Sequence, residues 1–367
     1  MKFTVSREKL IKPLQQVAGV VERRQTLPVL SNVLMVVEGN KLSMTGTDME
    51  VELVAHIELD DSVPAGEVTI PAKKLVDICK SLPGDSDISF ELNDQKMVVK
   101  SGRSRFSLAT LPANDFPNLE EAGGDIAFTI NQGYLKQIID RTSFAMAQQD
   151  VRFYLNGMLF ELSTNRLRAV ATDGHRLALC DGEAVIEVTE VTQAIVPRKG
   201  VIEVARLFND DESDVSIALS QNHIRLETSE LRFTSKLVDG KFPDYQRVLP
   251  KKGDKVVIGE KSELKQSFSR AAILSNEKYR GVRIKISDGN ICIVANNPEQ
   301  EEAEEVLSVD YQGPELEIGF NVNYLLDVMN VIVSDSVKMT LNDSNSSALL
   351  TDAEDESAMY VVMPMRL

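Results

Sequence analysis

The residues with the clearest chemical character lie in one short stretch, Val170–Leu179. It contains Asp173 and His175, a carboxylate beside an imidazole, which is a pairing that acid–base catalysis can use. The other two histidines, His56 and His223, lie in or next to strand patterns and are predicted to be structural. No nucleophile accompanies the pair, and the phosphate-binding, dinucleotide-binding, zinc-protease, serine-hydrolase and Cys-x-x-Cys motifs are all absent from the sequence. We therefore predict no catalytic site.

Metal and cofactor chemistry is also not predicted. The acidic run Glu301–Glu305 is more typical of a solvated face or of salt-bridge partners than of a metal site. Cys79, Cys180 and Cys292 are far apart, and each lies inside an apolar run. Three reduced, buried thiols in a cytosolic protein are the expected result, rather than disulfides or metal ligands.

Length and composition indicate a soluble protein with several domains. A chain of 367 residues is too long for one ordinary core, and 43% hydrophobic with 26% charged residues is a globular composition. No apolar run reaches membrane-spanning length, and Met1–Thr4 does not begin a signal peptide, so we expect a cytoplasmic protein without a membrane partner. The net charge of −16 argues against nucleic acid, although a mean charge does not say where the cations lie.

The turn Thr172–Arg176 has counterparts at a nearly constant spacing, in Thr47–Glu50 and Asn296–Glu299. Long internal repeats decide an architecture more reliably than local patterns do. Three helical segments also align without gaps, and polar linkers near 122–126 and 250–254 separate the copies. The helical segments are 71–82, 197–208 and 321–332, and the predicted domains are 1–124, 125–253 and 254–367.

Each copy shows the same predicted order of elements. A short strand leads into a helix, paired strands follow, and a second helix and alternating strands complete the copy. The predicted N-caps of the first helices are Ser6, Asn131 and Ser262, while Pro71 and Pro197 fit the first position of the second helices. The predicted hairpins pair 33–38 with 41–45, 157–162 with 167–171, and 282–287 with 290–295. The fold class is therefore α+β, with three domains that each pack two helices on one face of an antiparallel sheet.

Basic residues recur on these helices away from the apolar stripe, whereas the turns and linkers are rich in acids. One interpretation is that they are ordinary solvated lysines and arginines. The other is a shared positive surface that contacts phosphates without reading bases. The second helix of the third copy, which has no basic residue, does not fit that surface. The cations concerned are Lys73, Lys80, Lys136, Arg141, Arg198 and Lys199.

The repeated unit resembles the bacterial β sliding clamps of DNA polymerase III over the whole chain. The stretches that carry this resemblance are Met1–Leu14, Thr172–Leu177, Phe242–Tyr245 and Met363–Leu367. It implies a non-enzymatic head-to-tail homodimer that forms a ring of six domains, with helices on the inner face and sheets outside. Duplex DNA would pass through without sequence readout. The implied partners are the polymerase III catalytic subunit, the clamp loader, and other clamp-binding polymerases and repair proteins.

The resemblance also implies a site for short partner peptides between the second and third domains. Asn345 departs from the apolar residue expected beside this site. The implied deep apolar part consists of Leu155, Thr172, Gly174, Leu177, Pro243, Val248, Val361 and Met363, and the implied mouth and groove consist of His175, Arg176, Arg247, Asn321, Tyr324, Ser347, Pro364, Met365 and Arg366.

Two further surfaces follow from the same resemblance. Arg24, Gln149, Phe153 and Tyr154 would lie near DNA, although Phe153 stands where a tyrosine is common. In the dimer, an apolar pair of one subunit would meet an apolar pair of the other, flanked by opposite charges. These are Phe106 and Leu108 against Ile273 and Leu274, with Lys74, Arg103 and Arg105 facing Glu299, Glu301, Glu302 and Glu305.

Two rival functions remain to be weighed against the clamp. A nucleotidyltransferase is disfavoured because the sequence has neither a triphosphate-binding motif nor a carboxylate pattern suited to metal ions. A peptide-binding scaffold that does not encircle DNA would use the same groove and is separated from a clamp only by experiment.

Overall fold

The computed structural model describes residues 1–21, 27–119, 126–208, 212–250 and 253–366. Within it the chain divides into two compact units. The first unit contains Met1–Gln132 and Arg206–Leu237, and the second contains Gly133–Ala205 and Val238–Leu367. Each unit therefore combines segments that are distant in the sequence.

The first unit contains two antiparallel sheets and two helices. One sheet has the strand order β1-β4-β5-β6, and the other has the order β2-β3-β14-β13-β12-β7. The elements are β1 (Lys2–Ser6), α1 (Arg7–Val20), a 3-10 turn η1 (Pro28–Ser31), β2 (Asn32–Thr47), β3 (Val51–Pro71), α2 (Ala72–Ser81), β4 (Asp87–Asn93), β5 (Lys96–Ser101), β6 (Ser104–Ala109), η2 (Ala113–Asp115), β7 (Ile126–Asn131), β12 (Asp214–Leu219), β13 (His223–Glu227) and β14 (Leu231–Lys236).

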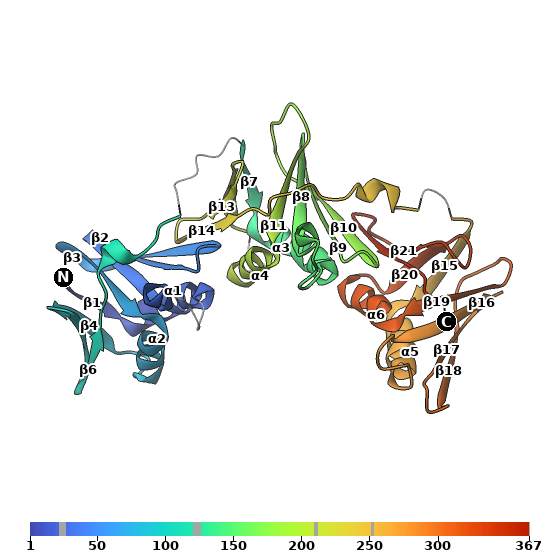
Figure 1. Cartoon of the computed structure of the whole chain (residues 1–367), viewed down its shortest axis with the longest axis horizontal. Helices are drawn as coiled ribbons and strands as arrows, with labels where there is room; N and C mark the ends of the chain where they lie inside the picture. The colour runs from blue at the N-terminus through green and yellow to red at the C-terminus, as the bar shows by residue number, and fades with distance from the viewer. Residues whose placement is uncertain (22–26, 120–125, 209–211, 251–252, 367) are drawn as a thin grey trace. The chain divides into compact units, whose positions relative to one another are not determined.

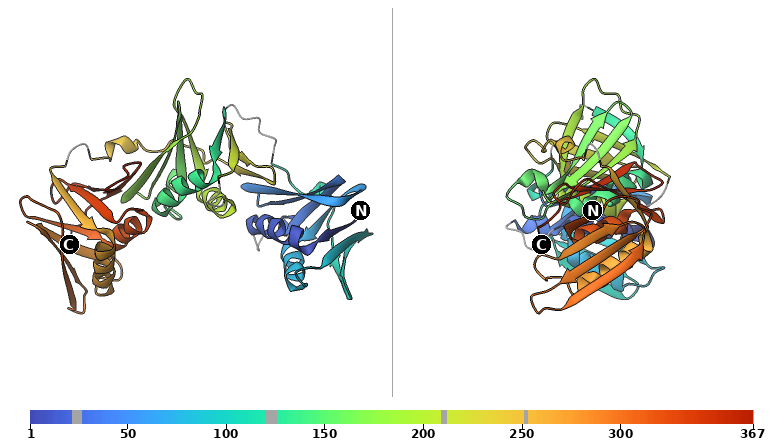
Figure 2. Two further views of the ribbon diagram at one scale, coloured as in Figure 1. Left: turned by 180° about the vertical axis from the view of Figure 1, so that it is seen from behind. Right: turned by 90° about the vertical axis from the view of Figure 1, so that its right-hand side faces the viewer.

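Helices α1 and α2 lie side by side, and α1 also packs on β2 and β3 (Figures 1 and 2). The apolar residues of α1 recur every three or four positions, so Leu10, Leu14 and Val17 are fully buried on one face. The helix continues through Pro13, which lies inside it. This amphipathic spacing, visible in the sequence, is what holds the helix pair on the sheet.

The second unit also contains two antiparallel sheets. The larger has the order β11-β8-β9-β10-β22-β21-β20-β15, and the smaller has the order β18-β17-β16-β19. Helix α5 packs on β17, β18 and α6 (Figure 1). The elements are α3 (Gln132–Thr142), η3 (Ser143–Ala145), η4 (Phe153–Leu155), β8 (Gly157–Ser163), β9 (Arg166–Thr172), β10 (Arg176–Glu183), β11 (Thr192–Pro197), α4 (Arg198–Leu207), η5 (Tyr245–Arg247), β15 (Lys255–Glu260), α5 (Lys261–Ile273), β16 (Gly281–Ser287), β17 (Asn290–Asn296), β18 (Glu302–Ser308), β19 (Leu316–Asn321), α6 (Val322–Val331), β20 (Ser336–Leu341), β21 (Ala348–Asp352) and β22 (Ala358–Val362).

Two of the three predicted hairpins are confirmed, and one is wrong. Strands β8 and β9 pair, as do β16 and β17. In the first copy, residues 33–38 and 41–45 do not pair with each other, because both belong to the long strand β2, which pairs with β3 throughout. Gly39, with φ +61, lies at a register shift in that ladder, so the turn-like Gly-Asn dipeptide marks an irregularity within a strand.

The helix starts differ from prediction in two ways. Ser6 caps α1 as expected, accepting from the Lys9 backbone N–H at 3.3 Å. Helix α5 is capped by Glu260, whose carboxylate accepts from the N–H groups of Ser262 and Glu263. The prediction for Ser262 was therefore two residues late, because a carboxylate can also cap a helix N-terminus. Pro71 immediately precedes the first helical residue of α2, one position earlier than predicted.

Two sheets are shared by successive copies of the repeat, which the expectation of one sheet per domain did not include. Strand β3 of the first copy pairs with β14, the last strand of the second copy. Strand β10 of the second copy pairs with β22, the last strand of the third. We call these the first junction (β3–β14) and the second junction (β10–β22).

The three cysteines carry free thiols. Cys79 and Cys180 are buried as predicted, and burial raises the pKa of each to about 11. Cys292 is only half-buried, so the prediction of three buried thiols was wrong at that residue. None of the described helices is long and apolar enough to cross a membrane.

Candidate functional site

The turn between β9 and β10 is built by side chains that satisfy its own backbone. The Thr172 hydroxyl accepts from the Gly174 N–H at 3.1 Å and donates to the Arg176 carbonyl at 2.6 Å. One Asp173 oxygen accepts from the N–H groups of His175 at 2.9 Å and Arg176 at 3.0 Å. Gly174 has φ +89, a conformation that L side chains rarely adopt. The turn therefore has a fixed shape and presents an exposed His175.

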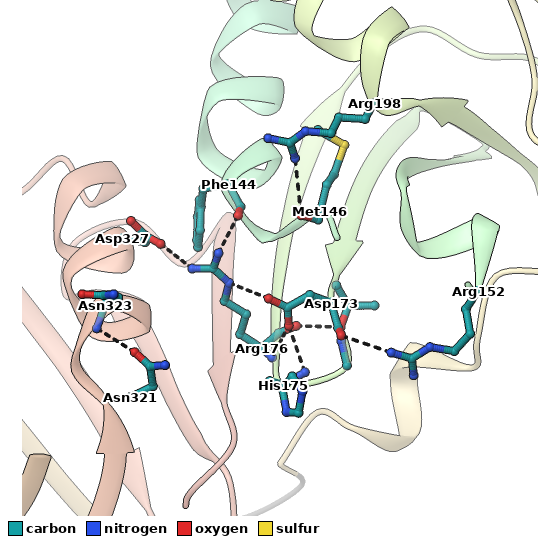
Figure 3. Close-up of polar contacts among 12 residues, drawn as sticks. Phe144, Met146, Arg152, Asp173, His175, Arg176, Arg198, Asn321, Asn323 and Asp327 are labelled. Carbon is teal, nitrogen blue, oxygen red and sulfur yellow. Dashed lines mark hydrogen bonds and ion pairs between the residues drawn. The ribbon is translucent and has the colours of Figure 1, made fainter. Parts of the chain in front are cut away.

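Arg176 is the most highly connected side chain at this turn (Figure 3). Its guanidinium forms ion pairs with Asp173 at 3.1 Å and with Asp327 of α6, and it donates to the Phe144 carbonyl at 2.8 Å. It also lies over two rings, 5.2 Å from the Phe144 centroid and 4.5 Å from that of Tyr324. Arg176 is only 13% exposed. In this structure it joins the turn to α6 as well as bordering the site.

A second arginine supports the turn from the preceding loop. Arg152 forms a bidentate pair with Asp150 at 3.0 and 2.8 Å, and its far nitrogen lies 3.4 Å from the Asp173 carbonyl. Hydrogen bonds from the Arg152 side chain and backbone lower the pKa of Asp150 to about 2. On the α6 side, the Asn321 side chain caps the helix by accepting from the Asn323 N–H at 2.9 Å (Figure 3).

The carboxyl-terminal segment runs alongside the same turn. Beyond the paired residues Leu177 and Val361 of the second junction, the Met363 N–H donates to the His175 carbonyl at 3.0 Å. The Met365 N–H then donates to the Gly319 carbonyl at 2.9 Å. The structure thus brings together the two stretches that the sequence singled out, the His175 turn and the terminal Met-Pro-Met-Arg segment.

An apolar cluster lies beneath the site. Leu177 and Val361 belong to it together with Phe242 and Tyr245, and Val248 packs against it while remaining partly exposed. Leu155 is also buried. Several residues predicted for the deep part of the pocket are therefore core residues in the unliganded chain. The accessible members of the predicted site, each partly or fully exposed, are Thr172, Gly174, His175, Arg176, Pro243, Arg247, Val248, Asn321, Tyr324, Ser347, Met363, Pro364, Met365 and Arg366.

A groove of about 470 Å³ lies beside Val248. Arg247 and Val248 form one wall, and Ser347 of the loop between β20 and β21 forms part of the other. Asn345, the departure noted in the sequence, lines this groove, so its amide makes the wall more polar. Asp343 holds the loop by accepting from the Asn345 N–H at 2.8 Å. The other lining residues are Leu249, Pro250, Gly253, Thr340, Leu341, Asn342 and Ser346.

The residues predicted to contact DNA differ in how exposed they are and in whether they already form ion pairs. Phe153 is 72% exposed, and Gln149 is exposed with φ +56. Lys73 and Lys80 are exposed on α2, whereas Tyr154, Arg198 and Lys199 are half-buried. Lys136 forms an ion pair with Asp140. Arg24 lies outside the described residues.

Arg141 is the prediction that the geometry supports least. Its guanidinium is 11% exposed and is bound to Asp355 at 2.8 Å and to the Ser357 hydroxyl at 3.0 Å. Arg141 was expected on the solvated face of its helix. Instead, it links α3 to the segment before β22. A side chain already paired and shielded in this way is poorly placed to bind a phosphate.

The residues predicted for the dimer lie on or beside two sheet edges. Phe106 and Leu108 are on β6, an edge strand in the first unit, and Arg103 and Arg105 are exposed beside them. Ile273, at the end of α5, is 75% exposed, and Leu274 is half-buried. Lys74 is exposed on α2. Glu299 and Glu301, which precede β18, and Glu302, its first residue, are also exposed, whereas Glu305 is half-buried and pairs with Arg270 at 2.6 Å.

Sequence reasoning missed several supporting residues. Phe144 and Asp327 hold Arg176, and Asp150 holds Arg152, yet none was predicted for the site. Asp327 could have been noticed in the sequence, because it aligns with Asp77 and Glu203 in the three repeated helical segments. Phe144 could not, because its contribution is a backbone carbonyl and a ring face that only the fold brings to Arg176.

Comparison with known proteins assigns the family. Three profiles, described as the N-terminal, central and C-terminal domains of the DNA polymerase III beta subunit, match residues 1–120, 129–244 and 246–366. The chain is 63% identical to a beta sliding clamp of Pseudomonas putida and 53% identical to that of Escherichia coli K12, with full coverage of both chains in each case.

A solved structure gives the same result. The crystal structure of a DNA polymerase III subunit beta from Pseudomonas aeruginosa bound to griselimycin matches with a TM-score of 0.98, at 62% identity over the whole of both chains. Together with the three domain profiles, this match shows that the chain belongs to the family of DNA polymerase III β subunits, the bacterial β sliding clamps.

Proposed function

We propose that two copies of this chain close head to tail into a ring of six domains around duplex DNA and tether the replicative polymerase to it. Helices would face the DNA and sheets would form the outer surface. The chain would act in the cytoplasm as a processivity factor and would catalyse no reaction of its own. Domain limits of 1–124, 125–253 and 254–367 are part of the proposal.

The observation that carries this proposal is a strand junction used twice within the chain. In each junction, the strand that follows the repeated turn pairs with the last strand of the next copy, β3 with β14 and β10 with β22. The third copy has an equivalent strand, β18, which is an edge strand of its sheet. The last strand of the first copy, β6, is also an edge strand. The β6 strand of a second chain can therefore complete the junction at β18.

Charge and apolar area at the two edges favour that pairing. The strand β6 and the turn before it carry Arg105 and Arg103, while β18 begins with Glu302 and is preceded by Glu301. The exposed Ile273 supplies apolar surface near the acidic edge. Because the two edges differ, the contact is heterologous. Two copies therefore close into a ring only if the contact relates one chain to the next by half a turn. Closure would also cover edge strands that otherwise invite aggregation.

The proposed partner site combines the groove beside Val248 with the side chain of Arg176 and the terminal Met363–Arg366 segment. It suits a short extended peptide, because apolar side chains can enter beside Val248 and Met363 while backbone groups bind at the polar rim. Methionine adapts to different apolar partners. The candidate partners are the polymerase III catalytic subunit, the clamp loader, other clamp-binding polymerases and repair proteins, and we infer that griselimycin binds this same groove.

Sequence-independent contact with DNA would come from exposed cations and from the loop that carries Gln149 and Phe153. Lysine and arginine contacts to phosphates give affinity without sequence information. The net charge of −16 would limit binding of DNA to the rest of the surface. Weak contacts inside a closed ring would permit sliding, because the topology prevents dissociation.

The decisive experiment loads the protein onto nicked circular DNA with a clamp loader and ATP, and then linearises the DNA. A clamp stays on the circle and is released from the linear molecule, as gel filtration of the DNA-bound fraction would show. A scaffold never loads, and a nucleotidyltransferase incorporates nucleotide when incubated alone with primed template. Omitting the clamp loader is the control for non-specific binding.

A second experiment addresses the partner site. Deletion of Met363–Leu367 should abolish binding of the polymerase catalytic subunit and of the clamp loader, as measured by fluorescence anisotropy. Sizing should show an unchanged dimer, because Met363 and Met365 bond to His175 and Gly319, which belong to neither β6 nor β18. Undiminished polymerase binding by the deletion variant would overturn the assignment of the groove.

A further inference from the structure

A row of polar side chains crosses four neighbouring strands of the eight-stranded sheet. Strands β11, β8, β9 and β10 place Gln193, Glu161, Arg168 and Asp181 directly opposite one another in turn. Gln193 donates to one Glu161 oxygen at 2.8 Å, and Arg168 contacts both Asp181 oxygens at 2.6 Å. None of the four lines the groove beside Val248. We call these four residues the polar row.

Tyr245 connects the polar row to the segment that follows β14. Its hydroxyl donates to the other Glu161 oxygen at 2.8 Å and accepts from Arg168 at 3.2 Å. Its ring packs in the apolar cluster with Leu159 and Val170, which lie two residues before Glu161 and two after Arg168 on the same sheet face. Tyr245 is 3% exposed and Glu161 is 5% exposed. Burial raises the pKa of Tyr245 above its ordinary value.

The same tyrosine begins the short turn η5 that forms one wall of the groove. The Val248 N–H donates to the Tyr245 carbonyl at 3.0 Å, and the Arg247 N–H donates to the Asp244 carbonyl at 3.3 Å. Arg247 itself is 85% exposed, so its side chain adds little to the anchoring of the turn. The placement of Val248 and Arg247 therefore depends on Tyr245, and the placement of Tyr245 depends on the polar row.

We propose that Tyr245, Glu161 and Arg168 are positioning residues for the peptide-binding groove. They hold η5 in place before a partner arrives, so binding does not have to order that wall. This inference rests on the proposed function of the groove but assigns a role to residues outside it. A buried carboxylate and a guanidinium that is only 13% exposed suit the task, because leaving either without its hydroxyl partner is unfavourable.

The competing explanation is that Tyr245 only stabilises the second unit. Tyr311 provides a matched control, because it is also 3% exposed, lies in the same unit, and donates one hydrogen bond, to the Pro314 carbonyl at 2.7 Å. Both Tyr→Phe substitutions remove one buried hydroxyl and keep the ring. Only Tyr245→Phe should affect the groove.

The experiment compares the full-length Tyr245→Phe and Tyr311→Phe proteins with the wild type. Hydrogen exchange on the unliganded protein should show the Val248 amide exchanging about tenfold faster in Tyr245→Phe alone. Calorimetric titration with griselimycin should show a dissociation constant raised about three- to tenfold, corresponding to about 0.6–1.4 kcal/mol. In a Val248→Ala background, Tyr245→Phe should have little additional effect, because its action passes through Val248.

Each outcome bears on the proposal. Unchanged Val248 exchange in Tyr245→Phe, or unchanged affinity despite faster exchange, would overturn it. A full additional loss in the Val248→Ala background would overturn it as well, and so would an equal loss of affinity in Tyr311→Phe. Failure of the wild type to bind griselimycin would instead count against the proposed function, and the exchange measurement on the free protein would still test the positioning of η5.

Discussion

The two turns Thr47–Val51 and Thr172–Arg176 are built alike, yet only the second belongs to the proposed partner site. In both, the threonine hydroxyl donates to a carbonyl four residues on, at 2.8 Å to Val51 and 2.6 Å to Arg176. In both, an aspartate oxygen accepts from the next two available N–H groups, as Asp48 does at 2.9 and 2.8 Å. The difference lies in the residues that these turns place at the following strand.

At the second junction, an arginine and an apolar pair follow the turn. Arg176 reaches α6, and Leu177 pairs with Val361 within the apolar cluster. At the first junction, Val51 stands in the place of Arg176, and Glu52 pairs with Thr234. The buried carboxylate of Glu52 would be unfavourable at the base of a pocket for an apolar peptide side chain. The repeat therefore supplies the frame, and a few substitutions decide which junction can bind a partner.

The largest expected effect concerns the proposed third junction, between β18 of one chain and β6 of a second chain. Ile273→Ala with Leu274→Ala should weaken the dimer by a factor of about 100 or more, because two apolar side chains leave a small interface and each truncation removes about 1–2 kcal/mol. Analytical ultracentrifugation at micromolar concentration should show monomers. Val333→Ala, which truncates another exposed apolar residue, is the control and should remain dimeric. A dimeric double variant would contradict the edge-strand interface.

The next effect tests whether Arg176 distinguishes the second junction from the first. Arg176→Val, which installs the residue found at the first junction, should lower the free energy of unfolding by about 2–4 kcal/mol. The reason is that Asp173 and the Phe144 carbonyl lose their partner. Griselimycin affinity measured by calorimetry should fall at least tenfold. Arg283→Val removes an exposed pair with Glu317 and should change stability by less than about 0.5 kcal/mol.

A smaller effect should appear at the residue after each aspartate. Gly174 has φ +89, and an added Cβ would lie 3.1 Å from an Arg152 nitrogen, so Gly174→Ala should destabilise by about 1–2 kcal/mol. Met49 occupies the equivalent place with φ +75 and is 42% exposed. Met49→Gly relieves that backbone strain and should be neutral or stabilising by up to about 1 kcal/mol. Denaturant unfolding measures the change in the free energy of unfolding for both variants. If Met49→Gly destabilised the protein as Gly174→Ala should, the two turns would not be equivalent.

The smallest effect depends on pH and concerns Glu52. Burial raises the pKa of Glu52, although a hydrogen bond from the Leu119 N–H at 3.1 Å opposes this. A raised carboxyl pKa stabilises the fold below the ordinary glutamate pKa, and this contribution is lost as the pH rises through the folded value. Glu52→Gln should therefore raise the melting temperature by a few degrees at pH 8 and by less at pH 4. A constant difference across that range would count against a raised pKa.

The repeat, the buried faces of the helices and the hydrogen bonds of the turns could be predicted from the amino-acid sequence. Residues such as Leu10 and Leu14 specify a buried helix face through their spacing, and Thr172 with Asp173 specifies the turn through bonds to its own backbone. These are local interactions, so short windows of sequence contain them. The family resemblance added the partner groove, and the structure places Met363 and Tyr324 beside the Thr172–Arg176 turn, whereas Arg247 and Ser347 line the groove beside Val248.

The pairing of strands between copies and the binding partners of the basic side chains became visible only in the tertiary structure. The residues 33–38 and 41–45 read as a hairpin, but they form one strand because β3 offers a longer ladder. Arg141 read as a solvated cation, yet Asp355 and Ser357, more than two hundred residues later in the chain, bind it. Tyr245 was noted only within the Phe242–Tyr245 stretch, and in the fold its hydroxyl lies between Glu161 and Arg168. Such pairings depend on distances between remote segments, which local sequence does not contain.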